Sequence, residues 1–155
     1  MRLTDVLSEQ LIKVPLEGQS KLEILRELID LACAEVDTDT RENILESVFE
    51  REGVMSTGIG QGIALPHGTS PRAMHFAAAL GIPHQPVDFN AIDDQPVTLI
   101  FLLISDEKHI NTKMKALARI SRLLHRQEFR TALVSCTTAA GAMQVITDEE
   151  ARHRI

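Results

Sequence analysis

The fold class follows from one apolar stretch in the second half of the chain, Val97-Thr98-Leu99-Ile100-Phe101-Leu102-Leu103-Ile104. This stretch holds no charged residue and is rich in branched side chains, which is typical of a strand covered on both faces of its sheet. Two further strands are predicted, a short one over 63–65 and a longer one over 76–82. Because the 97–104 stretch is far too short to cross a bilayer as a helix, we expect no direct membrane insertion.

Helical patterns occupy the chain before these strands. The sequence Ser20-Lys21-Leu22-Glu23 forms a capping box, in which a hydroxyl and a carboxylate satisfy free amide groups of the first helical turn. The helix that follows is expected to bury Leu22, Leu25, Leu28, Ile29 and Ala32. A second helix is expected to begin near 38–40, to stop at Gly53, and to bury Ile44, Leu45, Val48 and Phe49.

Helical patterns return after the strands. A long helix is predicted from about 111 or 112 to 124, with an inward face made of Met114, Leu117, Ile120, Ser121 and Leu124. Shorter helices are predicted over 128–135 and 138–144. Helices first, strands in the middle and helices last predict an α/β fold in which a mixed sheet lies between two helical layers. The length of 155 residues, without a linker-like tract, predicts a single domain over residues 1–155.

Composition narrows the function classes. The net charge of −6 is uneven, because residues 1–50 carry 5 Lys/Arg against 12 Asp/Glu, a net −7, whereas residues 51–155 carry a net +1. The second part is therefore expected to receive an anionic ligand better. Five Phe without Tyr or Trp offer few stacking platforms, so nucleic-acid binding is not expected. Two cysteines without a Cys-x-x-Cys pattern, and an N-terminus without a signal-peptide pattern, predict a cytoplasmic protein.

Most histidines and a row of basic residues carry little functional signal. Neither a metal site nor a cofactor is predicted, because zinc-like spacing with Cys or acidic residues is absent around His75, His84, His109, His125 and His153. The third predicted helix is expected to carry a basic stripe on its outer face, made of Lys115, Arg119, Arg122, Arg126 and Arg130. A solvated face explains this stripe first, and contact with an acidic partner second.

The segment 53–68 is rich in glycine and contains Gly53, Gly58, Gly60, Gly62 and Gly68. Glycines let backbone amides approach an oxyanion without a Cβ in the way, so such a loop can cradle phosphate. The segment lacks both the Lys-Ser/Thr ending of a P-loop and the full spacing of a dinucleotide fingerprint. A phosphate cradle and a plain glycine-rich connection therefore remain equally good explanations.

His67 makes the phosphate interpretation more specific. It follows the short predicted strand and lies between Pro66, which fixes φ, and Gly68, which removes bulk. This arrangement holds an imidazole at a strand end, and a neutral ring nitrogen near pH 7 is a competent nucleophile toward phosphorus. For an isolated histidine, a surface or hydrogen-bonded role is the more frequent explanation.

The run Ser56-Thr57-Gly58-Ile59-Gly60-Gln61-Gly62-Ile63-Ala64-Leu65-Pro66-His67-Gly68 resembles the active-site signature of the fructose/mannitol-type enzyme IIA domains of the bacterial phosphotransferase system. The similarity extends through 89–97 and 116–124 and covers nearly the whole chain. The resemblance implies a single three-layer α/β/α domain with a mixed parallel and antiparallel sheet. It also implies that His67 accepts a phosphoryl group on Nε2 from an HPr-like phosphocarrier protein.

The resemblance extends to residues that would stabilise the phosphoryl group. Arg51 matches the arginine that the family places near the phosphorylation site, and Gly68 closes the signature. Many relatives carry a second histidine at the start of a later helix, where this chain has Lys113, and His109 lies out of register. Helical spacing turns Lys113 inward with Leu117, and its ammonium group can supply charge and donors but no neutral acceptor. A solvated side chain is the alternative for both Arg51 and Lys113.

Three functions are compatible with this sequence. The first is a free-standing IIA protein of the nitrogen-regulatory branch, which binds regulatory target proteins according to its phosphorylation state. The second is a sugar-transport IIA that passes phosphate to a separate IIB domain, and the exchange of histidine for Lys113 places that onward transfer more in doubt than acceptance from HPr. The third is a binding module that no longer carries phosphate.

Overall fold

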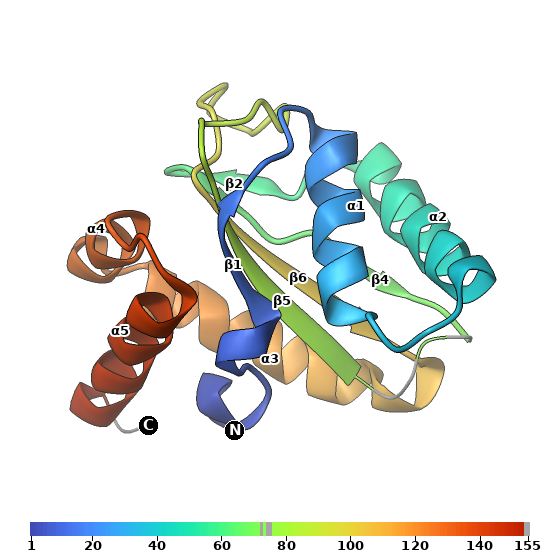
Figure 1. Cartoon of the computed structure of the whole chain (residues 1–155). Helices are drawn as coiled ribbons and strands as arrows, with labels where there is room; N and C mark the ends of the chain where they lie inside the picture. The colour runs from blue at the N-terminus through green and yellow to red at the C-terminus, as the bar shows by residue number, and fades with distance from the viewer. Residues whose placement is uncertain (72, 74–75, 154–155) are drawn as a thin grey trace.

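The computed structural model describes residues 1–71, 73 and 76–153, and it consists of helices around one mixed sheet (Figure 1). The strands are β1 (Ile12–Leu16), β2 (Gly58–Gly60), β3 (Ile63–Ala64), β4 (His67–Thr69), β5 (Phe76–Pro83) and β6 (Leu99–Ser105). The α-helices are α1 (Lys21–Ala32), α2 (Thr38–Val54), α3 (Ile110–Leu124), α4 (Gln127–Val134) and α5 (Ala139–Arg152). Three short 3-10 helices complete the fold, η1 (Leu3–Asp5), η2 (Glu9–Leu11) and η3 (Glu107–His109).

The sheet is mixed, as predicted. Its strand order is β1-β5-β6-β3-β2, and β4 pairs with the far end of β6. The pairs β1–β5, β3–β6 and β4–β6 are parallel, whereas β5–β6 and β2–β3 are antiparallel. The sequence prediction found β5, β6 and the region of β3, but it did not identify β1, β2 or β4, because these short strands lack an extended apolar pattern.

The central position of the 97–104 stretch is confirmed. All seven residues of β6 are buried, because the strand pairs with β5 on one side and with β3 and β4 on the other. The strand begins at Leu99 rather than at Val97, which instead forms an isolated antiparallel bridge with Val87. A continuous apolar strand of this kind needs cover on both faces, and the helices supply it.

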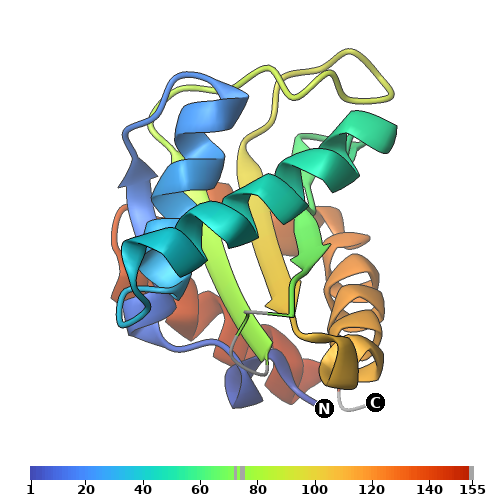
Figure 2. The same cartoon turned by 90° about the vertical axis from the view of Figure 1, so that its right-hand side faces the viewer.

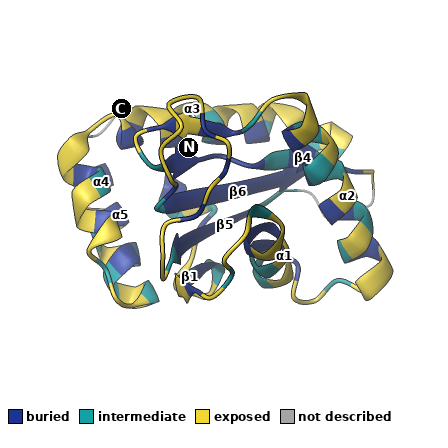
Figure 3. Ribbon diagram, turned by 90° about the horizontal axis from the view of Figure 1, so that it is seen from above, coloured by how far each residue is buried: buried dark blue, intermediate teal, exposed yellow. Residues whose placement is uncertain are grey.

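Two apolar cores lie on the two faces of the sheet. The first is formed with α3, α4 and α5 and contains Leu65, Leu103 and Ile120. The second is formed with α1 and α2 and contains Ala64, Ile104 and Val48. Figure 3 shows the buried strands between these two helical layers. Within the described part of the chain, none of the helices combines the length and the apolar composition needed to cross a membrane.

The first two helices confirm Ser20 as the predicted cap, but the Glu23 carboxylate accepts from the amide of Gln19 at 3.2 Å rather than from an amide of the first helical turn. Ser20 Oγ accepts a hydrogen bond from the backbone amide of Glu23 at 3.2 Å, and α1 begins directly after Ser20. Leu22 is not buried as predicted, because the inward face of α1 starts at Ile24 and leaves Leu22 48% exposed. The predicted stop at Gly53 is also wrong, because α2 continues to Val54.

The later helices correct the predicted inward face. Met114 and Ser121 are exposed, and α3 instead buries Lys113, Ala116, Arg119, Ile120, Leu123 and Leu124. The last helix is longer than the predicted 138–144, because α5 runs from Ala139 to Arg152 behind a Thr138 cap. Its second half buries Glu149 and Glu150, whose charges hide an inward face from hydrophobic periodicity.

Candidate functional site

His67 is the first residue of β4, at an edge of the sheet. The strand pairs in parallel with the end of β6, whose other side is occupied by β5, and no other described strand pairs with β4. Figure 2 shows β4 between α2, from one helical layer, and α3, from the other. Side chains from both layers can therefore reach the edge at which His67 lies.

The imidazole of His67 is oriented by the backbone two residues before it. Its Nδ1 lies 2.9 Å from the carbonyl oxygen of Leu65. Since a carbonyl oxygen only accepts hydrogen bonds, Nδ1 carries the hydrogen, and the lone pair of the neutral ring lies on Nε2. The side chain is only half-buried. The ring thus holds its lone pair on Nε2, the nitrogen to which the family resemblance assigns the phosphoryl group.

The surroundings of His67 favour its neutral form. Burial lowers the pKa of His67, and the positive charges of Arg51 and Lys113 lower it further. The hydrogen bond to Leu65 and the negative charge of Glu52 act in the opposite direction, but they do not cancel the effect of burial on this pKa. A histidine whose pKa lies below its ordinary value is mostly unprotonated near pH 7, so its lone pair is available.

Lys113 points inward, as the helical spacing predicted, and it lies on the His67 side of β4. It is 5% exposed, and its Nζ donates a hydrogen bond to Oγ1 of Thr69. Thr69 is two residues after His67, so the two side chains share one face of the strand. Burial lowers the pKa of Lys113. The ammonium group therefore belongs to the surroundings of the imidazole rather than to the solvated surface.

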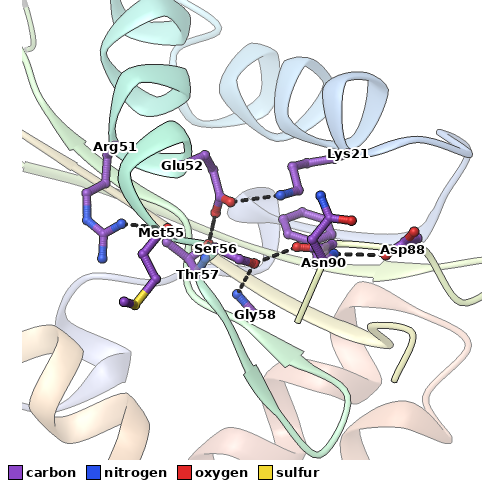
Figure 4. A network of polar contacts seen from close by, with 10 residues as sticks. Lys21, Arg51, Glu52, Met55, Ser56, Thr57, Gly58, Asp88 and Asn90 are labelled. Carbon is purple, nitrogen blue, oxygen red and sulfur yellow. Dashed lines mark hydrogen bonds and ion pairs between the residues drawn. The ribbon is translucent and has the colours of Figure 1, made fainter. Parts of the chain in front are cut away.

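Arg51 approaches the site from the other helical layer. It lies in the last turn of α2, and its Nη1 donates a hydrogen bond to the carbonyl oxygen of Met55 at 2.8 Å, as Figure 4 shows. A cation at this position also interacts favourably with the negative end of the helix dipole. The residue is half-buried overall, and its positive charge acts on the pKa of His67. Arg51 and Lys113 thus flank the imidazole from α2 and α3.

Gly68 faces away from His67, toward α2. A Cβ at this position would lie 3.0 Å from Val48 Cγ2 and 3.2 Å from the backbone nitrogen of Val48. Ser47 Oγ donates to the carbonyl oxygen of Thr69 at 2.7 Å and holds the helix against the strand. Gly68 is therefore needed for the close approach of α2, which in turn places Arg51 beside the site.

Sequence reasoning did not identify Thr69 and Glu52. Alternation along a strand could have placed Thr69 on the His67 face, once β4 was known to be a strand. Glu52 is 7% exposed although it is flanked by Arg51 and Gly53 near a helix end. No pattern in the sequence distinguishes this buried carboxylate from a solvated one, because its partners Lys21 and Thr57 come from other segments.

The remaining candidates carry other roles or fall outside the described residues. In the described ranges, no three His, Cys, Asp or Glu side chains are grouped so that they could hold a metal ion, and His75 falls outside those ranges. The predicted outer basic stripe needs correction at Arg119, which is buried with its Nε 3.5 Å from Glu150 Oε1. Arg126 lies 3.7 Å from Glu149 Oε1, so part of the stripe forms ion pairs within the chain.

Large apolar side chains are exposed beside the site. Val54 and Met55, at the end of α2, are 82% and 65% exposed. Ile110 and Met114, in the first turns of α3, are also exposed. Exposed apolar side chains grouped around a polar centre are typical of a surface that contacts another protein. We call these four residues the apolar rim.

Comparison with known proteins gives the site a family context. The family model described as "Phosphoenolpyruvate-dependent sugar phosphotransferase system, EIIA 2" matches residues 5–149. A nitrogen regulatory protein of Bradyrhizobium diazoefficiens is 34% identical over 146 residues, which cover 94% of this chain and 95% of that protein. The fructose-specific EIIABC component of Bacillus subtilis is 31% identical over 150 residues, which cover 97% of this chain but only 24% of that protein.

A solved structure resembles the fold closely. The crystal structure of the nitrogen regulatory protein IIA-Ntr from Neisseria meningitidis superimposes with a TM-score of 0.82 at 26% sequence identity. The superposition covers 93% of this chain and 98% of that one. The mixed sheet between helical layers is thus shared along almost the full length of that protein.

Proposed function

Because the chain belongs to the EIIA 2 family of the phosphoenolpyruvate-dependent sugar phosphotransferase system, its role is that of a phosphocarrier, and we propose that it carries the phosphoryl group on Nε2 of His67. The observation that carries this proposal is the hydrogen bond from Nδ1 to the carbonyl oxygen of Leu65. It leaves Nε2 as the nucleophilic atom of a ring whose pKa is lowered by burial.

The transfer needs no further reactant. The lone pair of Nε2 forms a bond to phosphorus while the bond between phosphorus and the donor breaks, and that electron pair returns to the donor. The hydrogen on Nδ1 stays in place, and the carbonyl oxygen of Leu65 stabilises the positive charge that the phosphorylated ring acquires. The cations Arg51 and Lys113 stabilise the negative phosphoryl oxygens, and Gly68 keeps Arg51 close.

The proposed donor is an HPr-like phosphocarrier protein, which meets this chain in the cytoplasm. Two features support a protein rather than a small molecule as the donor. The apolar rim places exposed apolar side chains next to Arg51 at the end of α2 and next to Lys113 at the start of α3, and such contact area is of the kind found in protein interfaces. The imidazole also lies at the sheet edge between α2 and α3, where the nitrogen of a partner can approach Nε2.

For the downstream role we propose the nitrogen-regulatory branch, in which phosphorylation state decides which target proteins are bound. The full-length match to the Bradyrhizobium nitrogen regulatory protein and the superposition on IIA-Ntr support this choice. The second candidate is a IIA unit that passes phosphate to a separate IIB domain, which the match to the fructose-specific relative favours. Lys113 argues against efficient onward transfer, because it offers charge but no neutral acceptor.

Labelling with radioactive phosphoenolpyruvate, enzyme I and an HPr-like protein tests the proposal. We expect the wild type to take up acid-labile phosphate and His67→Ala to take up none. His84→Ala is the matched control, because His84 is an exposed histidine outside the site and its loss leaves labelling unchanged. A wild type that takes no label from any HPr-like donor would support the non-phosphorylated binding module instead.

Addition of a IIB domain and its sugar separates the two downstream roles. Label that passes beyond this protein to the sugar would exclude a purely regulatory role. Label that stays on His67, together with a target protein that binds only one phosphorylation state, would support the nitrogen-regulatory assignment.

A further inference from the structure

Glu52 is a buried carboxylate that joins three segments of the chain next to the site. Its Oε1 accepts hydrogen bonds from the backbone amide of Thr57 at 3.0 Å and from the hydroxyl of Thr57. Its Oε2 accepts from Nζ of Lys21, in the first turn of α1, at 3.0 Å. Figure 4 shows the carboxylate between these two partners. A carboxylate this deeply buried requires such donors, because an unpaired charge there would be strongly destabilising.

A series of hydrogen bonds leads from Glu52 to the imidazole. The amide of Thr57 binds the carboxylate, and the carbonyl oxygen of Thr57 accepts from the amide of Leu65 at 3.0 Å. The carbonyl oxygen of Leu65 then accepts from Nδ1 of His67 at 2.9 Å. The backbone that holds the ring is therefore fixed, two steps away, by the position of Glu52.

The partners of Glu52 are themselves held in place. Lys21 Nζ lies 5.2 Å from the centre of the Phe89 ring, within the range of a cation–π interaction. Ser56 Oγ donates to the carbonyl oxygen of Phe89 and accepts from the amide of Gly58 at 3.0 Å. The start of the glycine-rich segment is thus fixed on both sides of Thr57, so the carboxylate binds a rigid partner.

The charge of Glu52 also acts on the ring directly. The charged groups around His67 are Arg51 and Glu52 from α2 and Lys113 from α3, and the two cations lower the pKa of His67 while Glu52 raises it. Without Glu52, the two cations that stabilise the phosphoryl group would lower the pKa of His67 further.

We propose that Glu52 is a positioning residue for His67, which sets the orientation of the imidazole through Thr57 and Leu65 and balances the two cations of the site. The proposal rests on the phosphocarrier role of His67 for its kinetic consequence, but the state of the ring can be measured without any transfer. A purely structural role is the alternative, in which Glu52 would only hold α1, α2 and the glycine-rich segment together.

Glu150 provides a matched control for this alternative. Glu150 lies in α5 and is 5% exposed. Its Oε1 accepts a hydrogen bond from the backbone amide of Leu3 at 2.5 Å and lies 3.5 Å from Nε of Arg119. Glu150 thus has the same kind of partners as Glu52, a backbone amide and a cation, in the other helical layer. Loss of its charge should reduce stability without an effect on His67.

The experiment compares wild type, Glu52→Gln and Glu150→Gln by NMR titration of the imidazole nitrogens and by the initial rate of phosphoryl uptake. For Glu52→Gln we expect a lower pKa of His67 and a loss of about ten-fold in uptake rate, because small displacements of reacting groups are costly. For Glu150→Gln we expect the wild-type pKa, the wild-type tautomer and the wild-type rate, with a similar decrease in thermal stability.

The double variant Lys21→Met/Glu52→Leu serves if Glu52→Gln does not fold, since apolar residues of similar volume often replace a buried ion pair without loss of stability. It removes the acceptor for Thr57 as well as the charge, so Nδ1 should lose the shift typical of its bond to Leu65. If Glu52→Gln or this double variant keeps the wild-type pKa, tautomer and rate, the positioning role is wrong. If the wild type takes up no phosphate, the phosphocarrier role fails, and the NMR comparison still decides the role of Glu52.

Discussion

The two faces of β4 differ in how closely their side chains are packed. The face toward α2 is filled, because Gly68 leaves no room for a Cβ and Ser70, just beyond the strand, donates to Asn43 Oδ1 at 2.7 Å. The face toward α3 carries His67 and Thr69, which are only half-buried and make hydrogen bonds rather than apolar contacts. Because successive side chains of a strand point to opposite faces, β4 packs against α2 with one face and presents the candidate site with the other.

Because of this difference, substitutions on the two faces should affect different properties of the protein. An added atom on the α2 face meets neighbours that cannot move freely, so substitution there should reduce stability first. A removed group on the α3 face leaves the core intact, so substitution there should reduce phosphoryl transfer first. Substitutions on each face can test this separation, and the largest effect is expected on transfer.

Removal of the Lys113 side chain should affect transfer most strongly among the groups around the nucleophile. For Lys113→Ala we expect phosphoryl uptake to fall by about a hundred-fold, as when one preorganised donor to a transition-state oxyanion is lost. Lys113→His should retain uptake and improve onward transfer to a IIB domain. Lys115→Ala, an exposed lysine of the same helix, is the control. Equal uptake rates in wild type, Lys113→Ala and Lys113→His would remove Lys113 from the site.

A methyl group at position 68 should mainly affect stability. For Gly68→Ala we expect a decrease of about 1–3 kcal/mol in the free energy of unfolding, because the new Cβ lies within 3.2 Å of the backbone nitrogen of Val48. Urea denaturation measures this change. A stability equal to that of the wild type would show that α2 can move away from β4. Close packing would then not require a glycine at this position.

The pH dependence of uptake should report the charges around His67. Because burial lowers the pKa of His67 below its ordinary value, the uptake rate should stay high as the pH falls through about 6.5 and decline only below that. Arg51→Met removes a cation, so the decline should begin at higher pH, the reverse of Glu52→Gln. Identical pH–rate profiles for wild type and Arg51→Met would show that the guanidinium is too far from the ring to affect the pKa of His67.

The same shift has a consequence for stability with a defined sign. Below about pH 6.5 the unfolded chain binds a proton at residue 67 more readily than the folded protein does, so the free energy of unfolding should decrease as the pH falls. Above that range this residue contributes nothing to the pH dependence. His67→Gln should remove that part of the slope, which denaturation at several pH values measures against the wild type.

The smallest expected effect concerns Gly53, which serves as the counterpart of Gly68. It lies inside α2, is exposed, and has no neighbour within 4 Å of a Cβ placed on it. Gly53→Ala should therefore raise the free energy of unfolding by about 0.5–1 kcal/mol and leave uptake unchanged. A loss of stability would mean that α2 needs a glycine near its end for a reason other than space.

Local patterns predicted the elements of this fold better than their inward faces. The uncharged run of β6 and the cap at Ser20 gave a correct central strand and a correct helix start. The face of α1 was placed wrongly at Leu22, because the pattern of apolar residues continues into the exposed first turn. Arg119 was placed on the surface, because its ion pair with Glu150 joins two helices that sequence periodicity treats separately.

The candidate site shows the same limit. A specific motif made His67 a candidate, and its role stays a prediction. Helical spacing predicted the inward orientation of Lys113, which its burial confirms. Both signals are local. Glu52 and Thr69 are bound by residues of other segments, Glu52 by Lys21 and by the nearby Thr57, and Thr69 by Lys113. Buried charges paired across elements have no signature in a single sequence.

The bond between Nδ1 and Leu65 has a kinetic consequence. With one ring nitrogen occupied by the backbone, a phosphocarrier of this design has a single reactive position, and donor and recipient must occupy the same space in turn. Ternary complexes are then excluded, and turnover follows a ping-pong scheme. An excess of dephosphorylated donor should therefore compete with any other protein that binds at His67, and a recipient, where one exists, would receive the phosphoryl group more slowly.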